Sequence, residues 1–486
     1  MQERSLSTLM GNLDLRTYKA TIVFVGLLIG AGCSNLDPWS EMQNAPTAPG
    51  TVSSVSPASE PATSRPSDLA GRKLTLAESI VLALENNPQT TSSWQAARAA
   101  AARVGQAKSE YLPTVGFTSS AARGNSTELV DKADAGVKNT FDAVFGVRYL
   151  LFDGGGRKAS VQGAEAELLA ANFQHNTVLQ DVVLSVEESY YDLLVAQRLR
   201  DVAIETVKQR DYHLQIAEAR HRTGLVAKSD VLKAQTEKAD ADLGLVQAEN
   251  AVRLAKGQLA SVMGFRVSEP FEIADVPDTD HRQELADIES LLDEAARNRP
   301  ELQTALAQID IRRAEVKAAE SRFWPALSFD TSIGWLGRTF FPNQDQWNVG
   351  AALDVPLFTG FDRTYQLHRT KADLAKAIAD QRGVLQGVEL EVWTAYWQII
   401  ESSQAVKAAS RFVASAEESA RMAEGEYKNG TGSMIELIDA QTTRTAARTQ
   451  LIQAGLDWYT AMARFERAVG RTMAASEVII KEKLKP

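Results

Sequence analysis

RTGLVAKSDVLKAQ (residues 222–235) and KNGTGSMIELIDAQ (residues 428–441) are two copies of one motif in this 486-residue chain. Both copies have glycine at their third position and glutamine at their last. The spacing from Gly224 to Gly430 also separates further pairs of identical residues, which are Phe152 and Phe358, Arg157 and Arg363, Tyr190 and Tyr396, and Gly264 and Gly470. A repeat that keeps its register over this length predicts two similar structural halves rather than two unrelated domains.

The first 32 residues have the layout of a secretory signal peptide. Basic residues precede an apolar run at 21–29, which is too short to span a bilayer and ends in small residues before Cys33. Small residues before a cysteine resemble a bacterial lipoprotein cleavage site, so we expect lipidation of Cys33; ordinary signal cleavage beside an incidental cysteine is the alternative. Residues 33–72 are rich in Pro, Ser and Ala and are expected to form a flexible linker.

The composition argues against several classes of function. A net charge of −10 argues against nucleic acid as a partner. One cysteine and five scattered histidines lack the spacing of metal ligands, and no catalytic triad is visible, so we expect neither a cofactor nor an enzyme. The run at 154–158, Gly-Gly-Gly-Arg-Lys, lacks the Gly-Lys-Ser/Thr ending of a phosphate-binding loop and is interpreted as a turn.

Each half of the chain predicts the same order of elements. The first structural repeat spans 73–264 and the second 288–470, with a linker at 265–287 and a tail at 471–486. In each repeat a short helix stops at an Asn-Pro or Arg-Pro step and a second helix starts there. Two segments of alternating character follow, which predict β-strands at 114–121 and 143–152, and at 326–335 and 347–358.

These predicted strands are rich in aromatic residues. Strands of about ten residues with aromatic ends have the length that a tilted strand needs to cross a membrane. The alternative is a pair of soluble hairpins packed on a helix.

A long segment without proline follows the strands in each repeat, at 157–223 and at 363–429. As a continuous helix, each would extend roughly 100 Å at about 1.5 Å per residue. Apolar residues at alternating intervals of four and three support a packed seam, namely Leu179, Val183, Val186, Tyr190 and Leu193.

Gly224 and Gly430 stand where a helix end needs a left-handed residue. The chain then reverses into a shorter helix. The sequence therefore predicts helical hairpins at 157–263 and 363–469, with their tips at the end opposite to the strands.

The strands of one chain cannot form a membrane structure alone. Four strands do not close a barrel, and open sheet edges are not tolerated in hydrocarbon. Three copies would supply twelve strands, an even number within the range of outer-membrane barrels. We therefore expect a homotrimer that forms a tube.

The duplicated strand-to-helix junctions (LLFDGGG at 150–156 and PLFTG at 356–360) and the duplicated tips resemble the TolC-like outer-membrane factor family. The resemblance covers residues from about Leu74 to Gly470. It implies a mainly α fold with a membrane β-barrel: a trimer with a 12-stranded barrel in the outer membrane, in contact with its lipid, and a long periplasmic α-helical barrel.

The same resemblance implies a passive exit duct of an efflux or type I secretion system. Its partners would be a periplasmic adaptor protein and an inner-membrane transporter of the RND or ABC type. A periplasmic adaptor is the alternative reading, although adaptors carry one helical hairpin and this chain predicts two. A periplasmic enzyme or coiled-coil structural protein is a further alternative.

Two carboxylates follow the second tip. Glu436 and Asp439 are three residues apart at a predicted helix start, so they share one face. In a trimer they would form a ring of six carboxylates, which attracts cations in pores, and they match the acidic ring of the family's periplasmic entrance. The alternative is that acids near a helix start only favour the helix dipole. In the first copy Asp230 is acidic, but Lys233 replaces the second acid.

The resemblance also implies a latch that keeps the tips closed. Tyr427 and Asp230 match a linked tyrosine and aspartate of the family, and Ser229 matches a neighbouring hydroxyl. Gly432 stands where the best-known member has an arginine, so the charged link is missing at that position or is replaced by Lys228. The alternative for Tyr427 is a packing role at a helix end.

Overall fold

The computed structural model describes residues 73–126, 136–275 and 286–471. The predicted signal peptide, Cys33, the Pro-rich linker and residues 472–486 lie outside the described residues. The chain divides into two compact units. One contains Arg98–Leu168 and Ile309–Ala375, and the other contains the described parts of Thr47–Ala97, Leu169–Gln308 and Lys376–Pro486.

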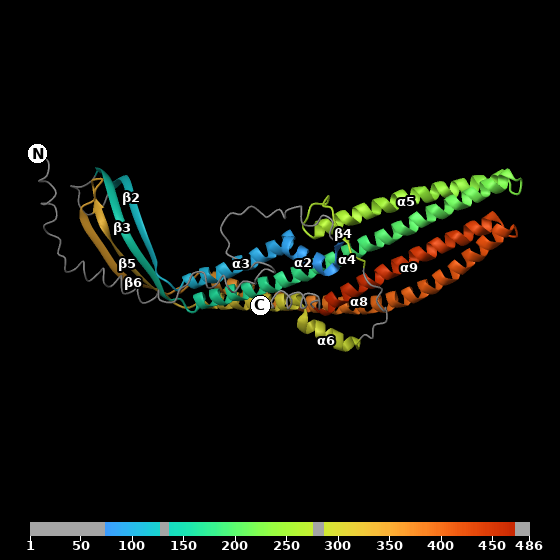
Figure 1. Ribbon diagram of the computed structural model, residues 1–486. Helices are drawn as coiled ribbons and strands as arrows, with labels where there is room; N and C mark the ends of the chain where they lie inside the picture. The colour runs from blue at the N-terminus through green and yellow to red at the C-terminus, as the bar shows by residue number, and fades with distance from the viewer. Residues whose placement is uncertain (1–72, 127–135, 276–285, 472–486) are drawn as a thin grey trace, which may run out of the picture. The chain divides into compact units, whose positions relative to one another are not determined.

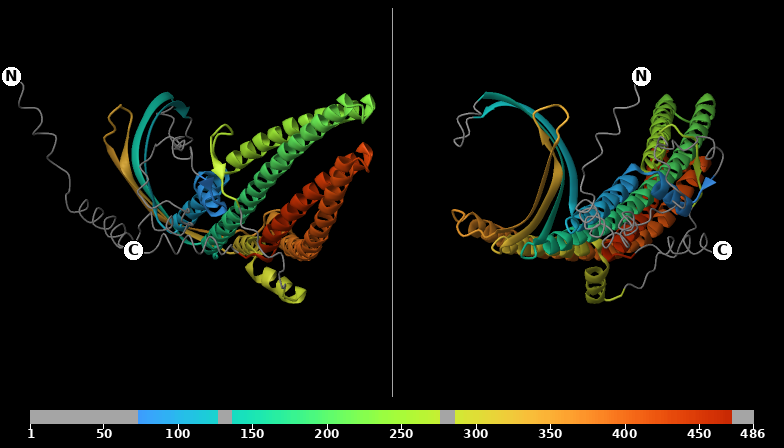
Figure 2. Two further views of the ribbon diagram at one scale, coloured as in Figure 1. Left: turned by 45° about the vertical axis from the view of Figure 1, so that its right-hand side comes forward. Right: turned by 90° about the vertical axis from the view of Figure 1, so that its left-hand side faces the viewer.

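The first unit contains a four-stranded antiparallel sheet with the order β2-β3-β5-β6 (Figure 1). Its strands are β2 (Thr114–Ser126), β3 (Gly136–Phe152), β5 (Ala326–Gly337) and β6 (Gln344–Asp354). Figure 2 shows that the strands curve along their length. Each repeat supplies one hairpin, and β3 of the first repeat pairs with β5 of the second, so the duplication produces one continuous sheet.

The two faces of this sheet differ in chemistry because side chains alternate along each strand. The register aligns Phe117 with Phe145, Phe145 with Ile333 and Ile333 with Trp347, all on one face. Phe117 is 57% exposed and Trp347 76% exposed, so this apolar face is uncovered in the single chain. The opposite face is polar and has an ion pair between Arg148 and Asp330 (2.8 Å).

Each of the four strands differs at one or both ends from the range expected from the sequence, and β5 extends to Gly337 instead of 335. β2 continues to Ser126 and β3 begins at Gly136, where glycines and polar residues weaken the alternation but cross-strand backbone pairing continues. β6 begins at Gln344 and ends at Asp354, not at 358. Its early end has a local cause, because Pro356 has no amide hydrogen to donate to a ladder.

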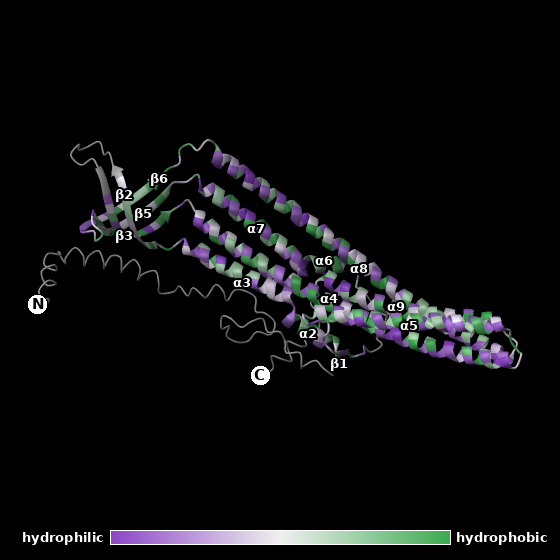
Figure 3. Ribbon diagram, turned by 90° about the horizontal axis from the view of Figure 1, so that it is seen from above, coloured by the Kyte–Doolittle hydropathy of each residue, from purple (hydrophilic) through white to green (hydrophobic). Residues whose placement is uncertain are grey.

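Two long helical hairpins follow the strands (Figure 1). They are α4 (Gly156–Arg222) with α5 (Lys228–Val262), and α8 (Asp362–Asn429) with α9 (Met434–Val469). Gly224 and Gly430 have φ values of 76° and 80° at the reversals, a conformation that other residues rarely adopt. Hydrophilic and hydrophobic residues are interleaved along these helices (Figure 3). Among the described residues, no helix has the length and hydrophobicity needed to cross a membrane.

Shorter helices precede the strands in each repeat. They are α2 (Leu76–Asn86) and α3 (Pro88–Ser109) in the first, and α6 (Ile288–Asn298) and α7 (Pro300–Ser321) in the second. At the step between them, the Asn87 amide donates a hydrogen bond to the Val262 carbonyl oxygen (2.8 Å). In the second repeat Arg299 replaces this asparagine and reaches the last carbonyls of α9 in the same way.

Residues 265–275, the described first part of the segment expected to be a linker, contribute to the core. Within it β4 (Glu272–Ile273) pairs in parallel with β1 (Lys73–Leu74). The Tyr190 hydroxyl donates hydrogen bonds to the carbonyl oxygens of both segments, at Leu74 (3.1 Å) and Ala274 (2.6 Å). Two-residue strands have no periodicity, which is why the sequence pattern did not predict them.

Arg157 and Arg363 hold the two strand-to-helix junctions in the same way. Each guanidinium donates hydrogen bonds to the end of the preceding strand segment and to the end of the preceding helix, and lies over an aromatic ring. The acceptors are the Leu151 and Glu110 carbonyls for Arg157, and the Pro356 and Arg322 carbonyls for Arg363. The rings are Tyr111 at 4.8 Å and Phe323 at 5.3 Å. The repeat showed that these arginines correspond but not what they contact.

Arg299 generates a prediction about stability. Its side chain is 2% exposed and pairs with Glu301 (2.9 Å) and Glu391 (2.7 Å). Arg299→Ala removes one of the two arginines that contact these carboxylates and takes a donor from the α9 carbonyls, while Arg467 still pairs with Glu301 and Glu391. We therefore expect the free energy of unfolding to fall by about 2 kcal/mol. Arg297→Ala removes an exposed arginine two residues away and is expected to change it by less than about 0.5 kcal/mol. The measurement is denaturant unfolding monitored by circular dichroism. Equal midpoints for both variants would contradict a stabilising role of Arg299.

Candidate gate at the hairpin tips

The two hairpins of one chain pack against each other near their tips. The contact is a small apolar cluster that contains residues of all four long helices, namely Ala217, Val231, Ala234, Tyr427, Met434 and Leu437. These residues lie at helical spacing on facing sides of the helices, so their burial joins the first hairpin to the second.

Arginines surround this cluster and link the hairpins by polar contacts. Arg210 of α4 donates to the Thr442 hydroxyl of α9 (3.0 Å) and lies 3.4 Å from the Glu237 carboxylate of α5. Arg444 of α9 donates to Gln209, and Arg448 bridges Glu205 of α4 and Glu417 of α8 (2.8 and 2.7 Å). A polar interface of this kind can separate in water at less cost than an apolar core.

Glu436 and Asp439 are the two carboxylates expected to form a ring. Both are exposed. Glu436 forms a capping box with Ser433: its carboxylate accepts from the Ser433 N–H (2.9 Å), and its own N–H donates to the Ser433 hydroxyl (3.2 Å). Hydrogen bonds from the Ser433 backbone, and then from its side chain, lower the pKa of Glu436. Glu436 therefore has the helix-starting role that the sequence left open, and it stays ionised at neutral pH.

The expected latch residues are near one another but are not linked as the resemblance implied. Tyr427 is 3% exposed, and its hydroxyl has no hydrogen-bond partner among the described residues, so no bond to Asp230 forms in the single chain. Burial raises the pKa of Tyr427. Its carbonyl oxygen instead accepts a hydrogen bond from the Arg220 guanidinium (2.7 Å). Ser229 is exposed and lines a groove.

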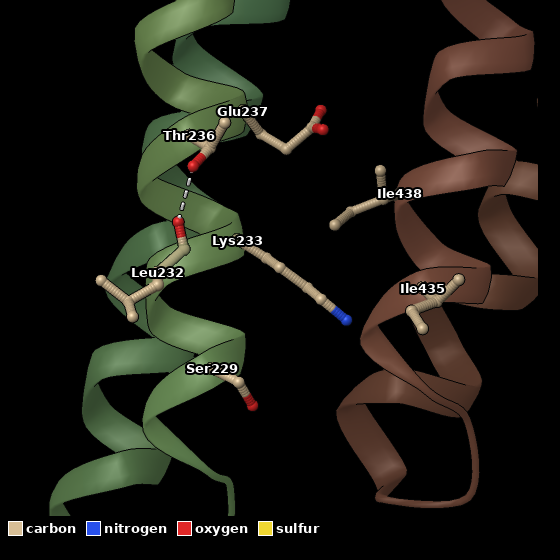
Figure 4. Close-up of a pocket in the computed structure, with 7 residues that line it drawn as sticks. All are labelled: Ser229, Leu232, Lys233, Thr236, Glu237, Ile435 and Ile438. Carbon is tan, nitrogen blue, oxygen red and sulfur yellow. Dashed lines mark hydrogen bonds between the residues drawn. The ribbon is translucent and has the colours of Figure 1, made fainter.

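That groove lies between α5 and α9 and has a volume of about 460 Å³. Figure 4 shows Lys233 extending from α5 toward α9, with Ile435 and Ile438 opposite it. Its lining combines apolar and charged side chains, namely Ser229, Leu232, Lys233, Thr236, Glu237, Ile435 and Ile438. Lys233, noted in the sequence only because it replaces an acid, thus faces the second hairpin.

His213 is a tip residue that sequence reasoning missed. It is 5% exposed on α4, and its Nδ1 has no partner among the described residues. Burial lowers the pKa of His213 from 6.5; Glu424 opposes this, and Arg210, Lys428 and Arg444 add to it. His213 and Glu237 both line a small void between α4, α5 and α9. Neither His213 nor Arg210 has an identical counterpart in the other repeat, so the duplication gave no signal for them.

A family model for outer membrane efflux proteins matches residues 79–265 and 291–471, which are the two repeats. The chain belongs to the outer membrane efflux protein family. Protein CyaE of Bordetella pertussis is 29% identical over 413 residues, covering 83% of this chain and 84% of that protein. TtgC of Pseudomonas putida, a probable efflux pump outer membrane protein, is 24% identical over 371 residues, with 75% and 76% covered.

A solved structure is also similar to this chain. The outer membrane protein VceC from Vibrio cholerae matches with a TM-score of 0.71 at 19% identity, over 81% of this chain and 96% of that one. This likeness supports the fold alone. Together the comparisons confirm the expected family, the mainly α fold and the outer-membrane location. The family consists of channel proteins, and the adaptor alternative finds no support.

The burial of His213 predicts that the tip contact is sensitive to pH. Burial lowers the pKa of His213 in the packed tip, so separated tips bind the proton more readily, and the stability of the packed tip decreases as the pH falls below about 6.5. We expect hydrogen exchange of tip amides, corrected for intrinsic rates, to accelerate between about pH 7.5 and about pH 5.5. His213→Gln, which does not titrate, should lose this acceleration. The same acceleration in the variant would contradict the assignment.

Proposed function

We propose that three copies of this chain assemble into a passive exit duct of an efflux or type I secretion system. The sheets of the three copies form a 12-stranded barrel in the outer membrane, and the hairpins continue it as an α-helical tube in the periplasm. A periplasmic adaptor and an inner-membrane transporter deliver the substrate and supply the energy. The homologous TtgC, named as an efflux pump component, supports the partnership.

The sheet supports this proposal most directly. It has an apolar and a polar face, as a barrel strand between lipid and a water-filled lumen requires. Its outer strands β2 and β6 each pair with only one strand within the described chain. Unpaired backbone groups are not tolerated in hydrocarbon, so each edge needs the sheet of another copy.

Two valines of β3 test the assembly. Val147 lies on the apolar face and Val144 on the polar face of the same strand. Arginine on a lipid-facing position costs about 2–4 kcal/mol at the bilayer midplane, whereas a lumen position tolerates charge. We expect Val147→Arg to reduce heat-modifiable trimers in the outer-membrane fraction and Val144→Arg to leave them unchanged. A wild-type protein recovered as periplasmic monomers would refute the duct itself.

The tip carboxylates test the proposed cation ring. Glu436→Gln removes the charge but keeps a side chain that can complete the capping box, so it separates pore electrostatics from helix capping. We expect Glu436→Gln combined with Asp439→Asn to weaken block of single-channel current by multivalent cations at least about tenfold. Asp457→Asn, on the same helix but far from the tip, serves as the charge control. Unchanged block in the double variant would contradict the cation ring, and Glu436 would then have only its role in the capping box.

A further inference from the structure

A cation of the first hairpin contacts the second hairpin at the tip, whereas the position that the resemblance assigned to a cation holds Gly432. We propose that this cation, Arg220 at the end of α4, is the link that holds the second hairpin of the same chain in the closed position. The proposal rests on the proposed duct and names a residue that regulates its opening.

Three observations show that Arg220 of the first hairpin contacts the second hairpin. Its Nη1 donates to the Tyr427 carbonyl oxygen (2.7 Å), and its guanidinium carbon lies 4.9 Å from the centre of the Tyr427 ring. Its Nη2 lies so close to Gly430 that a Cβ there would come within 3.3 Å of it. One side chain of the first hairpin therefore contacts the helix end, an aromatic face and the turn of the second.

The chemistry of the contact suits a cation. Tyr427 lies in the last turn of α8, where free carbonyls and the helix dipole create negative potential. Its carbonyl oxygen also accepts the turn hydrogen bond from the Gly430 N–H (3.1 Å). A planar guanidinium can hydrogen-bond to such a carbonyl and lie over the ring at once, which an ammonium does less well.

A second contact of the same kind runs in the opposite direction. Lys428 of α8 lies 5.4 Å from the centre of the Tyr212 ring of α4 and pairs with Glu424 (2.7 Å). A cation of α4 thus contacts a ring of α8, and a cation of α8 contacts a ring of α4. Opening the tip by moving one hairpin away from the other would break both contacts.

The two positions considered from the sequence do not provide this link. A Cβ at Gly432 would lie 3.0 Å from the Glu426 Cβ and 3.2 Å from the Tyr427 nitrogen, so a larger residue there requires these neighbours to move slightly. Lys228 is exposed and makes no hydrogen bond or ion pair with any residue in the described part of the chain. Arg220, by contrast, contacts both the backbone carbonyl and the aromatic ring of Tyr427 on the opposite hairpin.

The test is single-channel conductance of the full-length protein in planar bilayers. Arg220→Gln removes the charge and the stacked plane, and we expect the closed-to-open equilibrium to shift toward open by about tenfold, equivalent to about 1.4 kcal/mol. Arg222→Gln and Lys228→Gln remove exposed tip charges nearby and should conduct like the wild type. Arg220→Lys keeps the charge without the planar contact and should open partially.

The outcomes separate the two proposals. A wild-type protein that forms no channels refutes the duct, whereas channels that Arg220→Gln leaves no more open than Arg222→Gln overturn the Arg220 link. Opening by Lys228→Gln alone would assign the link to Lys228 and also overturn it. If Arg220→Gln does not form heat-stable trimers, Arg220→Lys decides: conductance equal to that of Arg222→Lys would overturn the proposal.

Discussion

Backbone groups without hydrogen-bond partners are not tolerated in hydrocarbon, and within the described part of the chain both edges of the four-stranded sheet are unpaired. Its apolar face, with Phe117, Phe145 and Trp347 aligned across the strands, is uncovered in the single chain. In the proposed trimer, lipid on that face and further copies at the edges would satisfy both needs at once. The hairpins would form a tube only if the sheets bring the copies together.

The duplication explains how one chain supplies both halves of this design, and the differences between copies show where the halves have separate tasks. Arg157 and Arg363 make the same contacts at equivalent junctions. By contrast, Arg299 replaces Asn87 and adds carboxylate partners on α7 and α8. The tips differ most: a capping box with Glu436 begins α9, whereas Ala227 begins α5 without a side-chain cap.

The sequence predicted features that depend on local rules. Periodic strands, long segments without proline and the left-handed glycines at 224 and 430 are properties of neighbouring residues. It did not predict contacts made by the tertiary fold. β4 is too short to have a period, and Arg220 and His213 gain their surroundings only when α4 packs against the second hairpin. The sequence could not assign Glu436 to one role, because its carboxylate fits both a capping box and a pore ring.

The proposed trimeric duct has a symmetry that can be imaged directly. Electron cryomicroscopy of the full-length protein in lipid nanodiscs should show threefold particles. We expect one closed barrel of twelve strands in the bilayer, with β2 of one copy beside β6 of the next and a helical tube below. Particles with a different symmetry, or sheets whose edges stay unpaired by a neighbouring copy, would contradict it.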